Sequence, residues 1–238
     1  MQLSSPIYHL KRKAKLLSRE RGLPLHQALD RTAVAEGFKG WSHLAASHAE
    51  QRPADRILSE LQAGDMLLLG ARPGHGKTMI GLELALLAPQ IRRSGFVFTL
   101  DYTEGDVLGR LAGIVAERRD SLSVDAASID ASDAICADYI IEQLEGDGGS
   151  AIVVIDYLQL LDQRRSTPEL GDQIQALKAV VEEQGAIIVM ISQIDRTFEA
   201  SDGMPGLGDV RLPNPIDLTL FNKTCFVHGG RIQLDEVA

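Results

Sequence analysis

The chain has 238 residues, of which 45% are hydrophobic and 24% are charged, and its formal net charge is −9. This length suits one sizeable α/β core with a small appendage, and the composition is that of an ordinary soluble globular protein. No apolar run approaches the ~20 residues of a membrane helix, no secretory signal is evident, and Cys136 and Cys225 lack the spacing of a zinc or disulfide framework, so we expect a cytoplasmic protein without membrane contact.

The first 50 residues are basic, with eight Lys or Arg against four Asp or Glu, a balance of +4 that leaves −13 for the remainder. Three helices are predicted in this segment, over residues 7–20, over residues 24–36 and from an N-cap at Ser42. We expect Phe38, Trp41 and Leu44 to fill the centre of the unit. The charge favours contact with nucleic acid or with another acidic partner, and the alternative is a solvated helix face.

Pro53 and its polar neighbours predict a linker, which divides the chain into a small basic three-helix domain, 1–52, and a larger domain, 53–238. Strands are predicted in the larger domain over residues 66–69, 95–100, 151–155 and 186–191, with closing strands at 218–221 and in a hairpin around Gly229 and Gly230. Helices are predicted over residues 77–89, 104–119, 131–145 and 168–184. This alternation predicts an α/β fold with a mostly parallel central sheet flanked by helices on both faces.

A glycine-rich segment lies between the first predicted strand and its helix. We expect this loop to cradle phosphates with its backbone N–H groups at a helix N-terminus, where Lys77 would reach the β- and γ-phosphates of ATP and Thr78 would bind Mg²⁺. The expected nucleotide-binding residues are Arg72, Pro73, Gly74, His75, Gly76, Lys77, Thr78 and Met79. The strict pattern requires glycine at position 71, where this chain has Ala71 and places Gly70 one residue early. The alternative is an ordinary strand–turn–helix corner, and His75 is interpreted as a spacer at the loop tip.

A second element of this chemistry is the apolar strand that ends at Asp156. A carboxylate at the carboxyl end of a central strand can hold Mg²⁺ through water and through Thr78. Buried strands often end in Asp, so the pairing of this strand with the glycine-rich loop carries the prediction.

Four segments resemble motifs of the DnaB-type replicative DNA helicases, in the order found in that family. Residues 71–78, ARPGHGKT, are similar to ARPSMGKT, where the alanine is typical, and residues 156–161, DYLQLL, are similar to DYLQLM. Residues 191–196, ISQIDR, look like LSQLNR, and the predicted helix over 170–178 resembles ISRSLK. The resemblance spans about residues 60–211, does not extend to the first 50 residues, and implies a RecA-like P-loop NTPase fold.

The resemblance also implies roles for single residues. Asp101 occupies the position of the family's catalytic glutamate, one methylene shorter, and Glu104 is a possible substitute or a helix first-turn charge. Gln193 matches a γ-phosphate sensor, with a strand-end amide bonded to backbone as the alternative. Together with Lys77, these are the expected catalytic residues.

Two loops of the resembling class line the central channel of a ring. Here one loop carries Arg164 and Arg165, which suit phosphate contacts or form a solvated rim, and the other, 197–210, is poor in basic residues. For the arginine finger that reaches a neighbouring subunit, Arg231 after the Gly-Gly turn is the first candidate and Lys223 the second.

The expected function is therefore a Mg²⁺-dependent ATPase related to replicative helicases. It would bind ATP and single-stranded DNA as a homo-oligomer, and a hexameric ring is one candidate form of this oligomer. The alternative is a nucleotide-switched regulatory or adaptor module without unwinding activity, whose basic N-terminal domain recognises a partner. The shortened carboxylate at Asp101 and the short C-terminal region after Lys223 favour this alternative.

Overall fold

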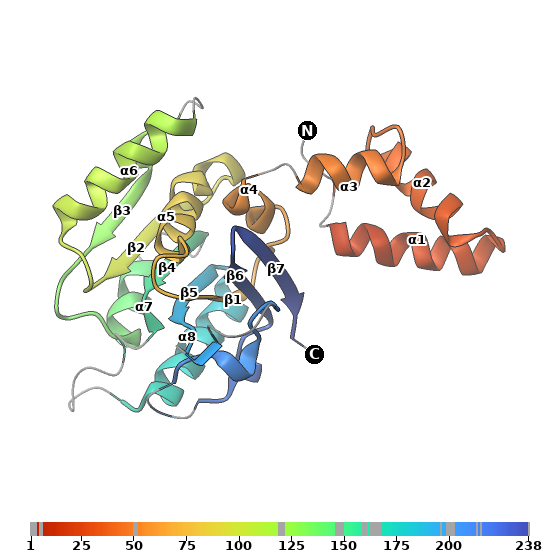
Figure 1. Cartoon of the computed structure of the whole chain (residues 1–238). Helices are drawn as coiled ribbons and strands as arrows, with labels where there is room; N and C mark the ends of the chain where they lie inside the picture. Colours follow the sequence, from red (N-terminus) through yellow and green to blue (C-terminus); the bar gives the residue numbers. More distant parts are fainter. Residues whose placement is uncertain are drawn as a thin grey trace. The chain divides into compact units, whose positions relative to one another are not determined.

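In the computed structural model, a helical unit precedes an α/β unit along the chain (Figure 1). The structure describes residues 4, 7–49, 52–118, 122–145, 150–158, 161, 168–195, 197–198, 203–212, 214 and 216–237. The two compact units are Met1–Leu61 and Gln62–Ala238. None of the helices within the described ranges is long and apolar enough to cross a membrane.

In the described part of the N-terminal unit there are four helices: α1 (Ile7–Arg21), α2 (Leu25–Ala35), α3 (Trp41–Ala49) and α4 (Pro53–Leu58). Leu10, Ala33 and Leu44 form its buried core, and Phe38 and Trp41 pack against them partly buried, as expected. The predicted N-cap at Ser42 is wrong, because the Trp41 backbone N–H donates to Asp30 Oδ1 at 2.9 Å and already belongs to α3.

The linker predicted at Pro53 is also wrong. Pro53 is the first residue of α4, a position where its missing N–H and fixed φ favour a helix start. The compact units divide between Leu61 and Gln62, so α4 is grouped with the N-terminal helices. The functional division of the chain at residue 52 stays a prediction.

The α/β unit contains a seven-stranded sheet with the order β3-β2-β4-β5-β1-β6-β7. Its strands are β1 (Met66–Ala71), β2 (Ser94–Thr99), β3 (Ala127–Asp130), β4 (Ala151–Asp156), β5 (Ile187–Gln193), β6 (Lys223–His228) and β7 (Arg231–Glu236). All neighbouring strands pair in parallel except β6 and β7, which form the predicted antiparallel hairpin. The predicted α/β architecture is confirmed.

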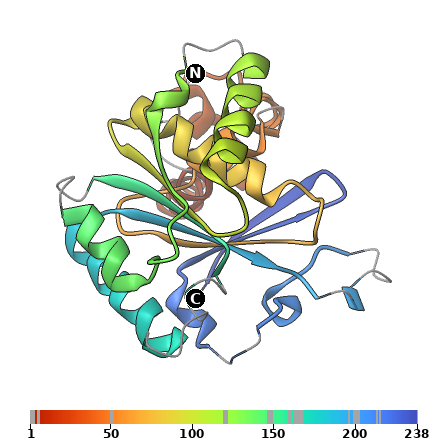
Figure 2. The same cartoon turned by 90° about the vertical axis from the view of Figure 1, so that its left-hand side faces the viewer.

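Helices cover both faces of the sheet (Figure 2). They are α5 (Lys77–Leu87), α6 (Glu104–Arg118), α7 (Ala137–Glu145) and α8 (Leu170–Gln184). In Figure 2, α5 and α6 lie on one face, and α7 and α8 on the other. The central strands β1 and β4 are buried throughout, which explains their continuous apolar sequences.

Three details differ from the sequence prediction. The edge strand β3 was not predicted, because four residues that include only one large apolar side chain, Ile129, carry little periodic signal. Residues 218–221 are not a strand: Leu218–Leu220 form a 3-10 turn in which Asp217 Oδ1 accepts from the Thr219 N–H at 2.9 Å. The helix predicted from residue 131 begins at Ala137, since the Ser132 N–H donates to Asp130 Oδ1 at 2.8 Å and closes a turn there.

Two glycines let α5 approach the sheet closely. A Cβ at Gly81 would lie 2.8 Å from Ile191 Cδ1, and one at Gly95 would lie 2.2 Å from the Ala85 carbonyl oxygen. These contacts fix the axis of α5, and therefore the direction in which its N-terminus points at the carboxyl edge of the sheet.

Candidate nucleotide-binding site

The residues singled out from the sequence gather at one edge of the sheet because parallel strands share their carboxyl ends. In the register, Asp156 at the end of β4 lies beside Thr99 at the end of β2. Ala71 at the end of β1 lies beside Gln193 at the end of β5. The topology therefore places the glycine-rich loop, Asp101, Asp156 and Gln193 around the same edge.

The loop over residues 72–76 has the backbone shape that its glycines predict. Gly74 and Gly76 have φ values of 81° and 86°, in the left-handed region that favours glycine. The His75 N–H donates to the Arg72 carbonyl oxygen at 3.2 Å and closes the turn. Gly76 caps α5 without a side-chain hydrogen bond, so no side chain competes for the N–H groups of the first turn. This arrangement suits an anion such as a phosphate.

The departure from the strict phosphate-loop pattern has a structural explanation. Ala71 is buried in β1 with ordinary strand pairing on both sides, so its backbone does not require glycine. Gly70 serves packing, since a Cβ there would lie 2.7 Å from the Phe226 ring. The loop itself begins after Ala71, and the glycines that it needs are Gly74 and Gly76.

Asp156 is the buried carboxylate of the site, with 3% of its surface exposed. Burial raises its pKa, whereas hydrogen bonding by Thr78 and the charge of Lys77 lower it. Its Oδ2 atom is buried and has no hydrogen-bond partner among the described residues. An orphaned buried acceptor next to a hydroxyl and an ammonium group fits a hydrated cation, so Thr78 and Asp156 are suitable ligands for Mg²⁺ alongside phosphate oxygens.

Asp101 lies two residues beyond the end of β2 and is exposed. Partial burial raises its pKa, and the charge of Lys77 lowers it, which places Asp101 in electrostatic reach of the loop lysine. Its backbone N–H donates to Thr99 Oγ1 at 3.2 Å.

Glu104 is the first residue of α6 and is exposed. The start of this helix is set by its neighbours, because Asp106 Oδ2 accepts from the Thr103 hydroxyl at 2.6 Å and the Asp106 N–H donates back to Thr103 Oγ1 at 3.2 Å. A first-turn acidic residue suits the helix dipole, the alternative role expected for Glu104. Its use in catalysis stays a prediction.

Arg110 belongs to this edge and was missed in the sequence. Its guanidinium carbon lies 4.3 Å from the centroid of the Tyr102 ring. Its charge also lowers the pKa of Asp156, behind the larger effects of burial, Thr78 and Lys77. The spacing of Asp106 and Arg110 on one face of α6 was the available signal.

Gln193 is held at the base of the loop that follows β5. Its carbonyl oxygen accepts from the Arg211 N–H at 2.8 Å, and Ile194 bridges Val210 in antiparallel fashion. The Asp195 N–H adds a bond to the Asp209 carbonyl oxygen at 2.8 Å. The two ends of the segment between Asp195 and Asp209 therefore lie side by side, next to the start of the phosphate loop, where the Ile194 N–H donates to the Ala71 carbonyl oxygen.

The predicted channel residues lie largely outside the described residues. This applies to Arg164 and Arg165, whose contact with nucleic acid stays a prediction.

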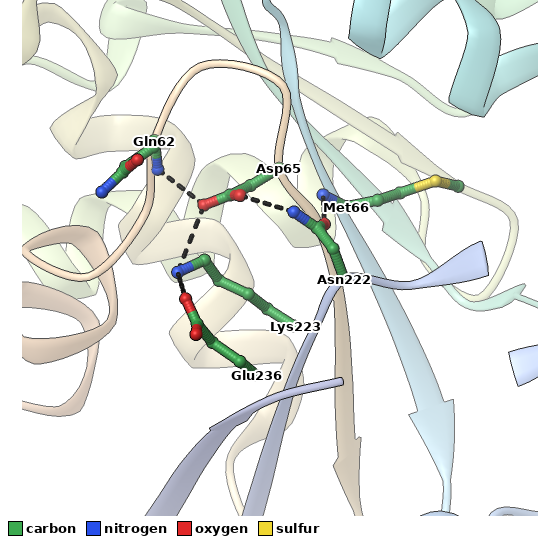
Figure 3. A network of polar contacts seen from close by, with 6 residues as sticks. All are labelled: Gln62, Asp65, Met66, Asn222, Lys223 and Glu236. Atoms are coloured by element: carbon green, nitrogen blue, oxygen red, sulfur yellow. Dashed lines mark hydrogen bonds and ion pairs between the residues drawn. The ribbon is translucent and has the colours of Figure 1, made fainter. Parts of the chain in front are cut away.

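Lys223 is wrong as a candidate finger. Only 3% of its side chain is exposed, and its Nζ lies 3.6 Å from Asp65 Oδ2 and 3.9 Å from Glu236 Oε1 (Figure 3). It pairs with Leu67 at the amino end of the sheet, the edge opposite the phosphate loop. A buried, ion-paired lysine cannot reach a neighbouring subunit.

Arg231 remains the candidate finger, because it is exposed at the phosphate-loop edge of the sheet, whereas Lys223 is buried at the opposite edge. It is exposed at the start of β7, after a turn in which Gly229 and Gly230 have φ values of 56° and 74°. It pairs with His228 at the carboxyl end of β6, on the same edge as the phosphate loop.

The strand order, the parallel pairing and the helices on both faces of the sheet define a RecA-like α/β fold. Residues 115–217 match the family model of the DnaB-like helicase C terminal domain. This part of the chain thus resembles the C-terminal domain of DnaB-like helicases, as the sequence motifs implied.

Curated relatives show the same resemblance. The replicative DNA helicase DnaB of Geobacillus stearothermophilus is 26% identical over 194 residues, which cover 68% of this chain and 43% of the relative. A probable plasmid replicative DNA helicase of Chlamydia muridarum is 29% identical over 181 residues, covering 63% of this chain and 40% of the relative. The chain therefore spans less than half the length of these relatives.

Solved structures share the fold. The ATPase domain of G40P superposes with a TM-score of 0.55 at 20% identity, covering 78% of this chain and 79% of that one. A DnaB-like replicative helicase, solved in a study of its interactions with primase, gives a TM-score of 0.57 at 19% identity, covering 92% of this chain and 65% of that one.

Proposed function

We propose that this chain binds ATP with Mg²⁺ and hydrolyses it as part of a helicase-type oligomer that acts on single-stranded DNA. The observation that carries the proposal is the orphaned Asp156 Oδ2, buried beside Thr78 and Lys77 at the end of a glycine loop. The relationship to replicative helicases supports the DNA substrate and the oligomer.

Each residue at the edge has a role that suits its position. The N–H groups of loop 72–76 and of the first turn of α5 bind phosphate oxygens, and Lys77 neutralises the β- and γ-phosphates. Thr78 and Asp156 hold Mg²⁺, which when bound neutralises charge that develops on the phosphates. Asp101 accepts the proton of the attacking water, and Gln193 senses the γ-phosphate.

In the proposed oligomer, an arginine finger from a neighbouring copy of the chain completes this site. Arg231 is exposed on the hairpin tip, and as a finger its charge would act on the γ-phosphate bound by the neighbouring copy. Hydrolysis then depends on assembly, because isolated chains present the loop without the finger.

The N-terminal unit supplies a separate surface. Six cations are exposed on α1, including Lys13 and Arg21. The other four share one helix face at spacings of three and four residues: Lys11, Arg12, Lys15 and Arg19. We propose that this face contacts nucleic acid or an acidic protein partner.

The test is ATP turnover with and without single-stranded DNA, combined with mass measurement of the assembly and a strand-displacement assay. We expect turnover that DNA stimulates and that Lys77→Ala abolishes. ATP binding without DNA-stimulated turnover or displacement would instead identify a nucleotide-switched adaptor. No difference in ATP binding between the wild type and Lys77→Ala would overturn the nucleotide site itself.

A further inference from the structure

Three aromatic rings meet beside the phosphate loop. The ring of His75, at the loop tip, stacks on that of His228, with centroids 5.3 Å apart and planes 22° from parallel. Phe198, from the segment after β5, meets His228 edge-on, with centroids 5.4 Å apart and planes at 88°. The stack joins three segments that are distant in sequence, and none of the roles proposed above uses it.

His228 stands between the phosphate loop and the hairpin tip. The preceding residue, Val227, pairs with Ala71, from which the loop begins. On its other side His228 pairs with Arg231 across the two-glycine turn. His228 therefore links, by strand pairing, the start of the phosphate loop to the residue that the hairpin tip presents.

The loop tip has open space on both sides of His75. Gly74 and Gly76 flank His75, and a Cβ built at either glycine would meet no heavy atom within 4 Å. The backbone on both sides of His75 thus has open space around it, while the His75 ring touches a neighbouring strand. Phosphates that fix the backbone of the loop would also fix this ring.

The His228 side chain carries a polar ring atom that packing alone does not require. Its Nδ1 atom is buried and lacks a hydrogen-bond partner within the described part of the chain. A phenylalanine or leucine would fill the same space without leaving a buried polar atom unsatisfied. Phe198, which is 8% exposed and belongs to the main hydrophobic core, anchors the far side of the ring.

We propose that the stack of His75, His228 and Phe198 couples the phosphate loop to the tip of the β6–β7 hairpin, so that nucleotide in the loop orders Arg231. His75 and His228 are positioning residues in this device. The inference rests on the proposed nucleotide binding and adds the contact through which the hairpin responds to it. An aromatic pair of this kind shifts a local opening equilibrium by roughly two- to tenfold.

Hydrogen exchange on the full chain tests the coupling at two places in one experiment. The amides of the phosphate loop report nucleotide binding, and those of residues 229–231 report order at the hairpin tip. The wild type is compared with His75→Ala and with His75→Phe, each without nucleotide and with Mg²⁺ and ATPγS. His26→Ala, an exposed histidine in the N-terminal unit, is the matched control.

In the wild type we expect ATPγS to slow exchange both in the loop and at the hairpin tip. In His75→Ala the loop should still be protected, because the phosphate contact proposed for this position is its backbone N–H, which alanine keeps. The response of the tip should fall by roughly two- to tenfold, and tip exchange without nucleotide should rise. His75→Phe should restore the response, because it keeps a stacking ring. His26→Ala should match the wild type.

The outcomes separate the two proposals. Loop protection with an equal tip response in the wild type and His75→Ala would overturn the coupling and leave the nucleotide site intact. A wild-type loop that ATPγS does not protect would overturn both. A double-mutant cycle adds a check: the effects of His75→Ala and His228→Ala on tip exchange should not add, and additive effects would also overturn the coupling.

Discussion

Arg110 holds its guanidinium over the ring of Tyr102, 4.3 Å from the ring centroid. Tyr102 directly follows Asp101, the candidate base, and the charge of Arg110 also acts on Asp156. A cation on α6 thereby stacks on the residue after Asp101 and lies within electrostatic reach of Asp156. Its stacking on Tyr102 fixes the arginine side chain where it can hold the loop after β2 in position.

Arg110→Ala should therefore lower ATP turnover by about tenfold, equivalent to roughly 1.4 kcal/mol in the barrier. Arg110→Lys should recover only part of the loss, since an ammonium group does not stack as a planar guanidinium does. The measurement is steady-state turnover with saturating Mg²⁺ and ATP. Arg31→Ala, an exposed arginine of the N-terminal unit, is the control, and equal turnover in both alanine variants would show that Arg110 has no part in the site.

Asp101→Asn should abolish turnover while nucleotide binding persists. An amide cannot accept the proton of water, and general-base catalysis contributes on the order of 10²–10⁴-fold. Burial raises the pKa of Asp101 and Lys77 opposes this, so the carboxylate is a better base than an ordinary aspartate. Since the base must be charged, the rate should rise with pH through the pKa of Asp101, at higher pH than for an unperturbed aspartate.

A comparison of Glu104→Gln with Asp101→Asn shows which of the two carboxylates acts as the base, a choice that the sequence left open. Glu104 lies exposed in the first turn of α6, so its loss should change turnover less than about twofold. Calorimetric ATP binding and turnover are measured on both variants. A dead Glu104→Gln enzyme beside an active Asp101→Asn enzyme would transfer the role of base to Glu104.

The parts of the site that follow from local chain geometry were predictable. A strand, a glycine turn and a helix N-terminus fix the phosphate loop, and a parallel sheet brings Asp156 and Gln193 to the same edge. The parts that depend on contacts between distant segments were not. Nothing in the order of residues shows that Arg110 reaches the Tyr102 ring, or that His75 meets His228.

The misread residues show the same limit. Lys223 follows the pattern of an exposed basic residue on a closing hairpin, and only the register with Leu67 reveals that it is buried at the opposite edge. Gly70 resembled a displaced loop glycine, and only the Phe226 ring against it reveals its packing role. The edge strand β3 is too short for its periodicity to register.

Gly95→Ala should destabilise the α/β unit by about 1–3 kcal/mol, because its Cβ would lie 2.2 Å from the Ala85 carbonyl oxygen and α5 would have to move. Gly109→Ala is the matched control: it lies in α6 with no heavy atom within 4 Å of a Cβ, and should stabilise by roughly 0.5–1 kcal/mol. Urea unfolding measures both. Equal midpoints for the two variants would contradict the close approach of α5 to β2.

Lys223→Met and Arg231→Ala should differ in which property they lose: the first should lose stability, and the second should lose turnover. Lys223→Met leaves Asp65 buried, although Asp65 still accepts from the Gln62 N–H at 2.7 Å and from Asn222 Nδ2 at 2.7 Å (Figure 3). Removing one partner of a buried pair costs about 3–5 kcal/mol, so this variant should unfold earlier in urea. Arg231→Ala removes an exposed side chain and should leave the unfolding midpoint unchanged.

Turnover completes this contrast between the two ends of the hairpin. If Arg231 acts as the finger, Arg231→Ala should lower the turnover of the assembled protein by on the order of 10³-fold without weakening assembly. Lys178→Met serves as the control for Lys223→Met, because its ion pair with Glu182, at 3.4 Å, is partly exposed and contributes less than about 1 kcal/mol. A Lys223→Met protein with wild-type stability and lost turnover would reverse the two assignments, since that behaviour belongs to a lysine that acts on nucleotide rather than on the base of the hairpin.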